Sequence, residues 1–117
     1  MKTCKLLREQ VAAATGSKKA ELVLKNAQIV NVFTQSVETG DIAIEGGYIV
    51  GIGNYEGITE KDLGGAYVCP GFLDGHIHIE SSMTSPGEFE RAVVPHGTIA
   101  VITDPHEIAN VAGTAGI

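Results

Sequence analysis

Residues 72–80 hold the densest group of side chains able to do acid–base or metal chemistry. Along an extended strand, side chains at alternate positions point to the same face. With this two-residue alternation, the polar residues of the segment would share one face, namely Asp74, His76, His78 and Glu80. The opposite face is apolar or small, with Leu73, Gly75, Ile77 and Ile79. The segment is therefore predicted to be a strand with one reactive face.

The pair His76 and His78 predicts a metal site on that face. Burying imidazoles and carboxylates costs free energy unless a partner satisfies them, and a divalent cation is such a partner. Two histidines at i and i+2 can aim both rings at one point, and imidazole suits Mn, Fe, Zn and Ni. The alternative is an exposed edge strand with a solvated polar face, because a bare His-x-His pair is common. The neighbouring Asp74, the apolar opposite face and the preceding Pro70-Gly71 favour the metal site.

A second group of polar residues, Asp104, His106 and Glu107, directly follows the next predicted strand. In parallel α/β proteins, ligands bind beyond the carboxyl ends of the strands. Two adjacent parallel strands would therefore bring this group and the histidine pair to the same rim. The alternative for Asp104-Pro105 is a turn and helix cap. The alternative for His106 and Glu107 is that they lie in the first turn of a helix, on a solvent-exposed surface.

The elements that would position both groups alternate between strand and helix. One strand is expected over Phe72 to Ile79, and a second over Thr98 to Thr103, which is rich in β-branched residues. Between them, the capping-box residues Ser85 to Glu88 start a helix that runs to about Val94. A further helix is expected from about Ile108. Strand, helix and strand joined by short links form a βαβ unit, which implies a parallel sheet.

The residues before this unit predict one helix and several strands. Residues 4–14 show the spacing of a short amphipathic helix with a packing role. Its apolar positions are Leu6, Leu7, Val11 and Ala14. From residue 21 to about residue 68 the pattern changes to short strands, which indicates a small β domain. Within it, the alternating runs 41–45 and 48–52 flank Gly46-Gly47, a strong hairpin signal.

The composition is that of an ordinary globular protein and argues against several other classes. Of the 117 residues, 44% are hydrophobic and 19% are charged, which suffices for one small core. The net charge of −6 and the scattered lysines disfavour nucleic acid as a partner. No apolar run approaches the ~20 residues of a membrane span, and no signal-peptide core is visible. Cys4 and Cys69 show no Cys-x-x-Cys spacing, so we expect two free thiols in a reducing cytoplasm.

Several stretches carry a resemblance to a known family. Residues 70–78, PGFLDGHIH, resemble the PGxxDxHxH opening of the amidohydrolase superfamily. The continuation HIESSM at 78–83 is similar to the adenine deaminase branch, as are PHGT at 95–98 and DPHEIANV at 104–111. Parts of residues 22–33 are similar to the N-terminal sandwich strands of the same superfamily.

The resemblance implies an α/β fold. A small N-terminal β-sandwich part would precede the first βαβ unit of a (β/α)8 amidohydrolase barrel, truncated after two strands. The corresponding domains are an N-terminal helix over 1–18, a partial β-sandwich over 19–69 and the start of the barrel over 70–117. A complete barrel takes ~250 residues, and the remaining ligands of the family come from later strands. We therefore expect this chain to be inactive alone, with a homo-oligomer or the remainder of the enzyme as its partner.

The resemblance also implies hydrolytic deamination of adenine to hypoxanthine and ammonia. The implied cofactor is a binuclear site of Mn²⁺, with Fe²⁺ or Zn²⁺ as alternatives. His76 and His78 would ligate one metal, whose bound water would attack C6 of adenine. The catalytic candidates, for proton handling or substrate binding, are Asp104, His106 and Glu107. The candidates for contact with the purine are Glu80 and Ser81. The alternatives are another amidohydrolase, such as a cyclic amidase or an N-deacetylase, and a non-catalytic remnant.

Overall fold

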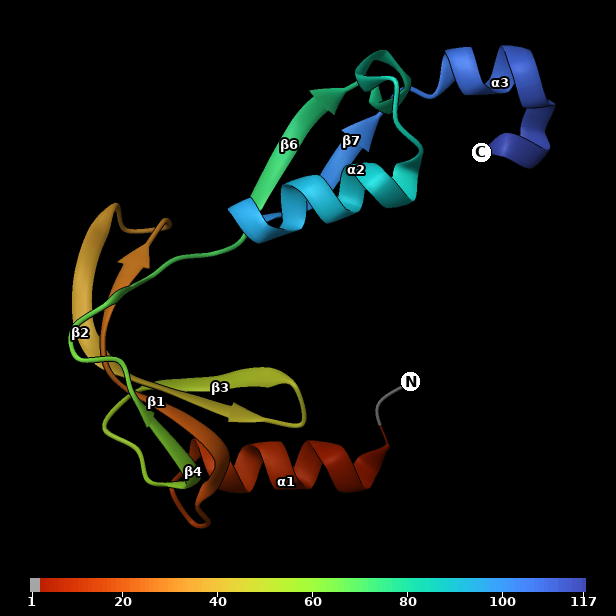
Figure 1. The fold of residues 1–117 in the computed structure, drawn as a ribbon. Helices are drawn as coiled ribbons and strands as arrows, with labels where there is room; N and C mark the ends of the chain where they lie inside the picture. The colour runs from red at the N-terminus through yellow and green to blue at the C-terminus, as the bar shows by residue number, and fades with distance from the viewer. Residues whose placement is uncertain (1–2) are drawn as a thin grey trace. The chain divides into compact units, whose positions relative to one another are not determined.

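The computed structural model describes residues 3–117, which divide into two compact units. Unit 1 ends at Cys69, and unit 2 runs from Pro70 to Ile117. Figure 1 shows the helices and strands of each unit. In the described part of the chain, no helix is long and apolar enough to cross a membrane.

Unit 1 opens with helix α1 (Cys4–Ala14), which confirms the helix predicted from the sequence. Thr3 caps its N-terminus, because the Oγ1 of Thr3 accepts a hydrogen bond from the Leu6 N–H at 3.4 Å. The helix contacts the second and third strands of the unit through Gln10 and Ala13, which are buried. Of the predicted apolar positions, Leu6 and Ala14 are half-buried, whereas Leu7 and Val11 are each 55% exposed, so only part of the predicted stripe is packed. Small Ala13 allows close approach, and the Gln10 side chain donates a hydrogen bond to the carbonyl of Glu45.

The strands of unit 1 form one mixed sheet. They are β1 (Ala20–Asn31), β2 (Ser36–Glu45), β3 (Tyr48–Gly53), β4 (Gly57–Asp62) and β5 (Tyr67–Val68). The order is β3-β2-β1-β4, and β5 also pairs with β1. The β1 strand is antiparallel to β2 and parallel to β4 and β5, and its register with β2 shifts between Leu24 and Ala27. The sheet therefore centres on β1 as the longest strand.

The hairpin predicted around Gly46-Gly47 is confirmed by the pairing of β2 with β3. Glu45 lies opposite Tyr48, and the two glycines have φ angles of +57° and +76°. A two-residue hairpin turn of type I′ requires positive φ at both central residues, which glycine adopts at little cost. The Gly46-Gly47 pair in the sequence therefore correctly predicted the tight turn that joins β2 and β3.

Small side chains dominate the core of unit 1, where buried apolar residues form two clusters. One cluster contains Ala13, Ala20, Val23 and Ala43. The other contains Ala27, Ile29 and Ile42. Several larger apolar side chains remain exposed, among them Ile49, Ile52 and Ile58. The core therefore depends on close backbone approach more than on bulky side chains.

Two buried carboxylates of unit 1, Asp41 and Glu45, are each paired with a lysine. Burial alone would raise the pKa of Asp41, but hydrogen bonds from Lys25 and from two backbone N–H groups outweigh it and lower the pKa. The hydrogen bond from Lys18 lowers the pKa of Glu45, against the opposing effect of burial. Both carboxylates are therefore ionised in the folded chain at neutral pH.

Unit 2 contains the predicted βαβ unit. Strands β6 (Phe72–Ile77) and β7 (Thr98–Thr103) are parallel neighbours, and helix α2 (Pro86–Val93) connects them and runs beside them (Figure 1). Short 3-10 turns follow β6 and α2, namely η1 (Ile79–Ser82) and η2 (Val94–His96). After β7 come helix α3 (His106–Ala112) and turn η3 (Gly113–Gly116). The capping signal at Ser85 is confirmed, because its Oγ accepts a hydrogen bond from the Glu88 N–H at 3.4 Å.

Two predicted boundaries in unit 2 are wrong. The strand expected to reach Ile79 ends at Ile77, and Glu80 lies in the turn η1 instead of on the strand. The chain turns there because the N–H of Ser81 donates to the carbonyl of His78 at 3.1 Å, which is a turn pairing and not a strand pairing. Helix α3 begins at His106, two residues before the predicted start.

Candidate metal centre

The carboxyl ends of β6 and β7 lie side by side, so the residues that follow the two strands meet at one rim. Ile77 pairs with Thr103 at the end of the ladder. The N–H of Asp104 is 3.4 Å from the carbonyl oxygen of Ile77. This arrangement confirms that the two groups of polar residues lie toward the carboxyl ends of adjacent parallel strands.

His76 and His78 turn their rings toward each other. Their Nε2 atoms are 3.1 Å apart, and the ring planes are nearly perpendicular, at 87°. Two nitrogens that each bind one cation at about 2.1 Å lie at most about 4.2 Å apart. The observed separation satisfies that limit, so the pair fits a shared divalent cation. Without a cation, the same two atoms share one proton in a hydrogen bond.

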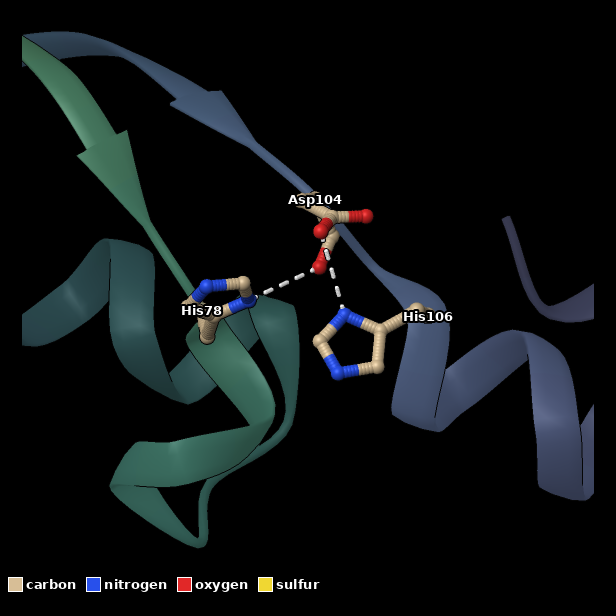
Figure 2. Close-up of side chains that lie close together, drawn as sticks. All are labelled: His78, Asp104 and His106. Atoms are coloured by element: carbon tan, nitrogen blue, oxygen red, sulfur yellow. Dashed lines mark hydrogen bonds and ion pairs between the residues drawn. The ribbon is translucent and has the colours of Figure 1, made fainter.

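The backbone of Asp104 sets the orientation of the His78 ring. Nδ1 of His78 lies 3.0 Å from the carbonyl oxygen of Asp104 (Figure 2). A carbonyl only accepts, so Nδ1 carries the proton, and Nε2 of a neutral ring is left with its lone pair. Histidines that bind metals are commonly held by such a hydrogen bond from their other ring nitrogen to a carbonyl or carboxylate. The contact therefore leaves Nε2 of His78 unprotonated in the neutral ring, as a metal ligand requires.

The side chain of Asp104 makes a second contact, with His106. Its Oδ2 atom lies 3.2 Å from Nδ1 of His106. A dashed line in Figure 2 marks this contact. Both side chains are more than half exposed. The rings of His78 and His106 are in edge contact, with centroids 5.0 Å apart. Asp104 thus contacts two histidines, one through its backbone and one through its carboxylate.

A cation could also be placed among His78, Asp104 and His106, because one ligand atom of each lies within 4.8 Å of the others. A cation on the Asp104 carboxylate or on Nδ1 of His106 would displace the hydrogen bond between those two groups. A cation on the Nε2 atoms of His76 and His78 leaves both contacts of Asp104 intact. It would displace the hydrogen bond between His76 and His78 instead, so the two placements differ in whether Asp104 keeps its contacts.

Glu80 does not face the histidine pair in the way the strand pattern predicts. Its Oε1 accepts a hydrogen bond from the N–H of Glu107 at 3.1 Å. Its Oε2 is enclosed and has no hydrogen-bond partner in the described part of the chain. Its own N–H lowers the pKa of the Glu80 carboxyl against burial, and the amides of Glu107 and Ile108 and the nearby His106 lower it further. The carboxylate is thus directed toward the start of α3.

The remaining predicted site residues take simpler positions. The carboxylate of Asp74 accepts a hydrogen bond from the N–H of His76 at 3.0 Å, which stabilises the backbone before the histidine pair. Ser81 and Glu107 are exposed, and no hydrogen bond brings either side chain into the histidine cluster of unit 2. Sequence reasoning missed the role of the Asp104 backbone carbonyl. Every residue has such a carbonyl, so its role cannot be predicted from residue type.

Comparison with known proteins supports the resemblance. Residues 67–117 match the amidohydrolase family. Adenine deaminase 2 of Carboxydothermus hydrogenoformans is 61% identical over 97% of this chain and 20% of that protein. Adenine deaminase of Geobacillus kaustophilus is 60% identical over 95% of this chain and 19% of that protein. Adenine deaminase of Listeria monocytogenes is 51% identical over 100% of this chain and 20% of that protein.

A solved structure is similar in fold. L-hydantoinase (dihydropyrimidinase) from Arthrobacter aurescens matches with a TM-score of 0.57 and 21% identity, over 74% of this chain and 21% of that one. At this identity the match indicates an amidohydrolase-type α/β fold alone. The chain spans about a fifth of the length of the curated relatives it matches. The chain is therefore similar to the adenine deaminases over nearly its whole length, and its residues 67–117 match the amidohydrolase family.

Proposed function

We propose that this chain supplies part of the active site of an adenine deaminase, which hydrolyses adenine to hypoxanthine and ammonia. One observation carries the proposal: the Nε2 atoms of His76 and His78 converge to 3.1 Å, while the Asp104 carbonyl holds the other nitrogen of His78. The identity of 61% to adenine deaminase 2 of C. hydrogenoformans supports adenine over other substrates.

The proposed architecture follows the domains expected from the sequence. The parallel pair β6 and β7 with α2 would be the first βαβ unit of a (β/α)8 barrel over residues 70–117. The mixed sheet of residues 19–69 would be part of a β-sandwich, preceded by the helical segment 1–18. The later barrel strands would come from the remainder of the enzyme or from another subunit, in the cytoplasm.

The proposed cofactor is Mn²⁺, with Fe²⁺ or Zn²⁺ as the alternatives, in a binuclear site of which this chain holds one part. His76 and His78 would hold one cation through Nε2, and Asp104 would keep the His78 ring in place. When bound, the cation supplies Lewis-acid chemistry that makes water nucleophilic near neutral pH.

His106 is the proposed proton carrier of this chain. The Asp104 carboxylate engages Nδ1 of His106, which leaves Nε2 of the neutral ring free to accept a proton. As the bond between C6 of adenine and the water oxygen forms, Nε2 would take a proton from water. It would return that proton to the exocyclic nitrogen, and the bond from C6 to that nitrogen would break to release ammonia. The remaining hydrogen of the water would move from the oxygen on C6 to N1, which gives hypoxanthine. Glu107 and Ser81, both exposed in unit 2, would contact the purine.

A chimaeric enzyme tests the proposal directly. The segment of C. hydrogenoformans adenine deaminase 2 that matches this chain is replaced by these 117 residues, and ammonia release from adenine is measured with Mn²⁺. We expect activity in the chimaera and its loss in the His76→Ala and His78→Ala variants. His96→Ala is the matched control, because His96 is an exposed histidine of the same unit in the turn η2, before β7.

A substrate panel separates the proposal from another amidohydrolase activity. The chimaera is offered adenine, a hydantoin and an N-acetylated amine at equal concentration. A folded chimaera that hydrolyses the cyclic amide or the acetamide, but leaves adenine intact, refutes the adenine assignment. A folded chimaera with no hydrolytic activity on any of them indicates a non-catalytic remnant.

A further inference from the structure

We propose that Glu80 is a positioning residue, which fixes helix α3 and thereby holds His106 next to His78. The inference rests on the proposed function, since it assigns a role to Glu80 within that site. The observation that carries it is the hydrogen bond from the N–H of Glu107 to Oε1 of Glu80, across 27 positions of the chain.

The start of α3 lacks the cap that its own sequence would normally provide. The first N–H groups of a helix have no partner within the helix, and a Ser, Thr, Asp or Asn at the N-cap usually accepts from one of them. Here the N-cap residue is Pro105, which makes no side-chain capping hydrogen bond. Glu80, from the turn after β6, supplies the missing acceptor at 3.1 Å. A negative charge at a helix N-terminus is also electrostatically favourable.

The position of Glu80 in the chain turns this cap into a link between two parts of the site. Glu80 is two residues after His78, and its partner Glu107 is one residue after His106. The hydrogen bond therefore joins the turn that carries one imidazole to the helix that carries the other. The rings of His78 and His106 are in contact, with centroids 5.0 Å apart. By this proposal, that contact depends on the hydrogen bond between Glu80 and Glu107.

Neither oxygen of Glu80 is available to bind a purine directly. Oε1 is engaged by the Glu107 N–H, and Oε2 is enclosed by the protein. Direct substrate binding, which the family resemblance implied for this residue, would require both this hydrogen bond and α3 to move. The geometry thus assigns Glu80 to holding the helix.

Hydrogen exchange in the 117-residue chain tests the joint without any substrate. We expect Glu80→Ala to speed the exchange of the Glu107 amide about fivefold, the effect of losing one cap. Glu80→Gln should stay within about twofold of the parent, because its carboxamide oxygen still accepts. Glu90→Ala, which removes an exposed carboxylate on α2, is the matched control. Equal exchange at Glu107 in the parent chain and in Glu80→Ala overturns the inference.

Kinetics in the chimaera then separate positioning from substrate contact. A displaced catalytic group costs turnover, so Glu80→Ala should lower kcat about tenfold or more with an unchanged KM for adenine. Glu80→Gln should restore most of that loss. A raised KM with unchanged kcat identifies Glu80 as a substrate contact and overturns the inference. An inactive parent chimaera refutes the proposed function instead. In that case, hydrogen exchange of the Glu107 amide still tests the role of Glu80.

Discussion

His78 and Asp104 are 26 positions apart in the chain, yet Nδ1 of His78 lies 3.0 Å from the backbone carbonyl oxygen of Asp104. The contact exists because the parallel strands β6 and β7 end together, which places the residue after one strand beside the residue after the other. It sets the tautomer of His78 and leaves its Nε2 facing His76. The proposed metal ligands are therefore organised by the main chain of the second strand.

The first prediction concerns metal binding by the histidine pair. His76→Ala or His78→Ala should weaken Mn²⁺ binding to the chimaera at least about 100-fold, since losing a ligand exceeds the usual effect of losing its support. His96→Ala should leave binding unchanged. Free Mn²⁺ is followed by electron paramagnetic resonance during titration. Equal affinity in His78→Ala and the parent would exclude this nitrogen as a ligand.

The second prediction separates the two contacts of Asp104. Asp104→Ala removes the carboxylate that orients His106 but keeps the carbonyl that orients His78. Mn²⁺ affinity should therefore stay within about threefold of the parent, while kcat falls about tenfold or more. Asp104→Asn should lie between, because its amide oxygen can still accept from His106. A parallel loss of metal affinity would mean that the carboxylate is itself a ligand.

Local sequence signals accounted for much of the fold. The hairpin at Gly46-Gly47 and the capped start of α2 at Ser85 each depend on the backbone preferences of a few adjacent residues, and both are present in the structure. The parallel pairing of β6 and β7 follows from the strand, helix and strand order. Short-range physics determines these features, so they could be predicted from residue type and spacing.

Contacts that are distant in sequence could not be predicted in the same way. The end of β6 at Ile77 comes with the turn η1, in which the Ser81 N–H donates to the carbonyl of His78, although the alternating sequence pattern continues to Glu80. The bond between Glu80 and the Glu107 N–H joins two segments whose relation only the folded rim defines. The packed face of α1 was predicted only in part, because buried Gln10 is polar. In the cases of Glu80 and Gln10 a tertiary partner outweighs the local pattern.

A third prediction concerns pH and the stability of unit 1. The pKa of Asp41 and the pKa of Glu45 are lower in the folded chain than their ordinary values of 3.8 and 4.5. Because a lowered pKa means that the unfolded chain takes up protons first, the stabilisation is present above those values. It is lost as the pH falls through the lower folded values. Urea unfolding followed by circular dichroism should show a midpoint that drops between pH 6 and pH 3, and the drop should shrink in Asp41→Asn.

A fourth prediction compares the two turn glycines of the β2–β3 hairpin. Both have positive φ, so alanine is strained at either position, by about 1 kcal/mol. A Cβ at Gly47 would meet open space, whereas a Cβ at Gly46 would come within 2.5 Å of the Leu6 Cδ1 on α1. Gly46→Ala should therefore lower the free energy of unfolding further, by about 1 kcal/mol, than Gly47→Ala does. Equal losses in urea titrations would show that Leu6 gives way freely.

The last prediction concerns the core of unit 1. Val23 is completely buried in β1, while Ile58 in β4 is 74% exposed. Val23→Ala removes two methyl groups from a packed cluster of small residues that cannot collapse around the gap, and should cost about 2 kcal/mol of unfolding free energy. Ile58→Ala removes more carbon atoms than Val23→Ala does, but from a solvent-exposed position. It should therefore change the free energy of unfolding by less than about 0.5 kcal/mol. Urea titration of both variants of the 117-residue chain measures the two losses in unfolding free energy. A larger loss in Ile58→Ala would mean that another molecule or segment covers β4 in solution.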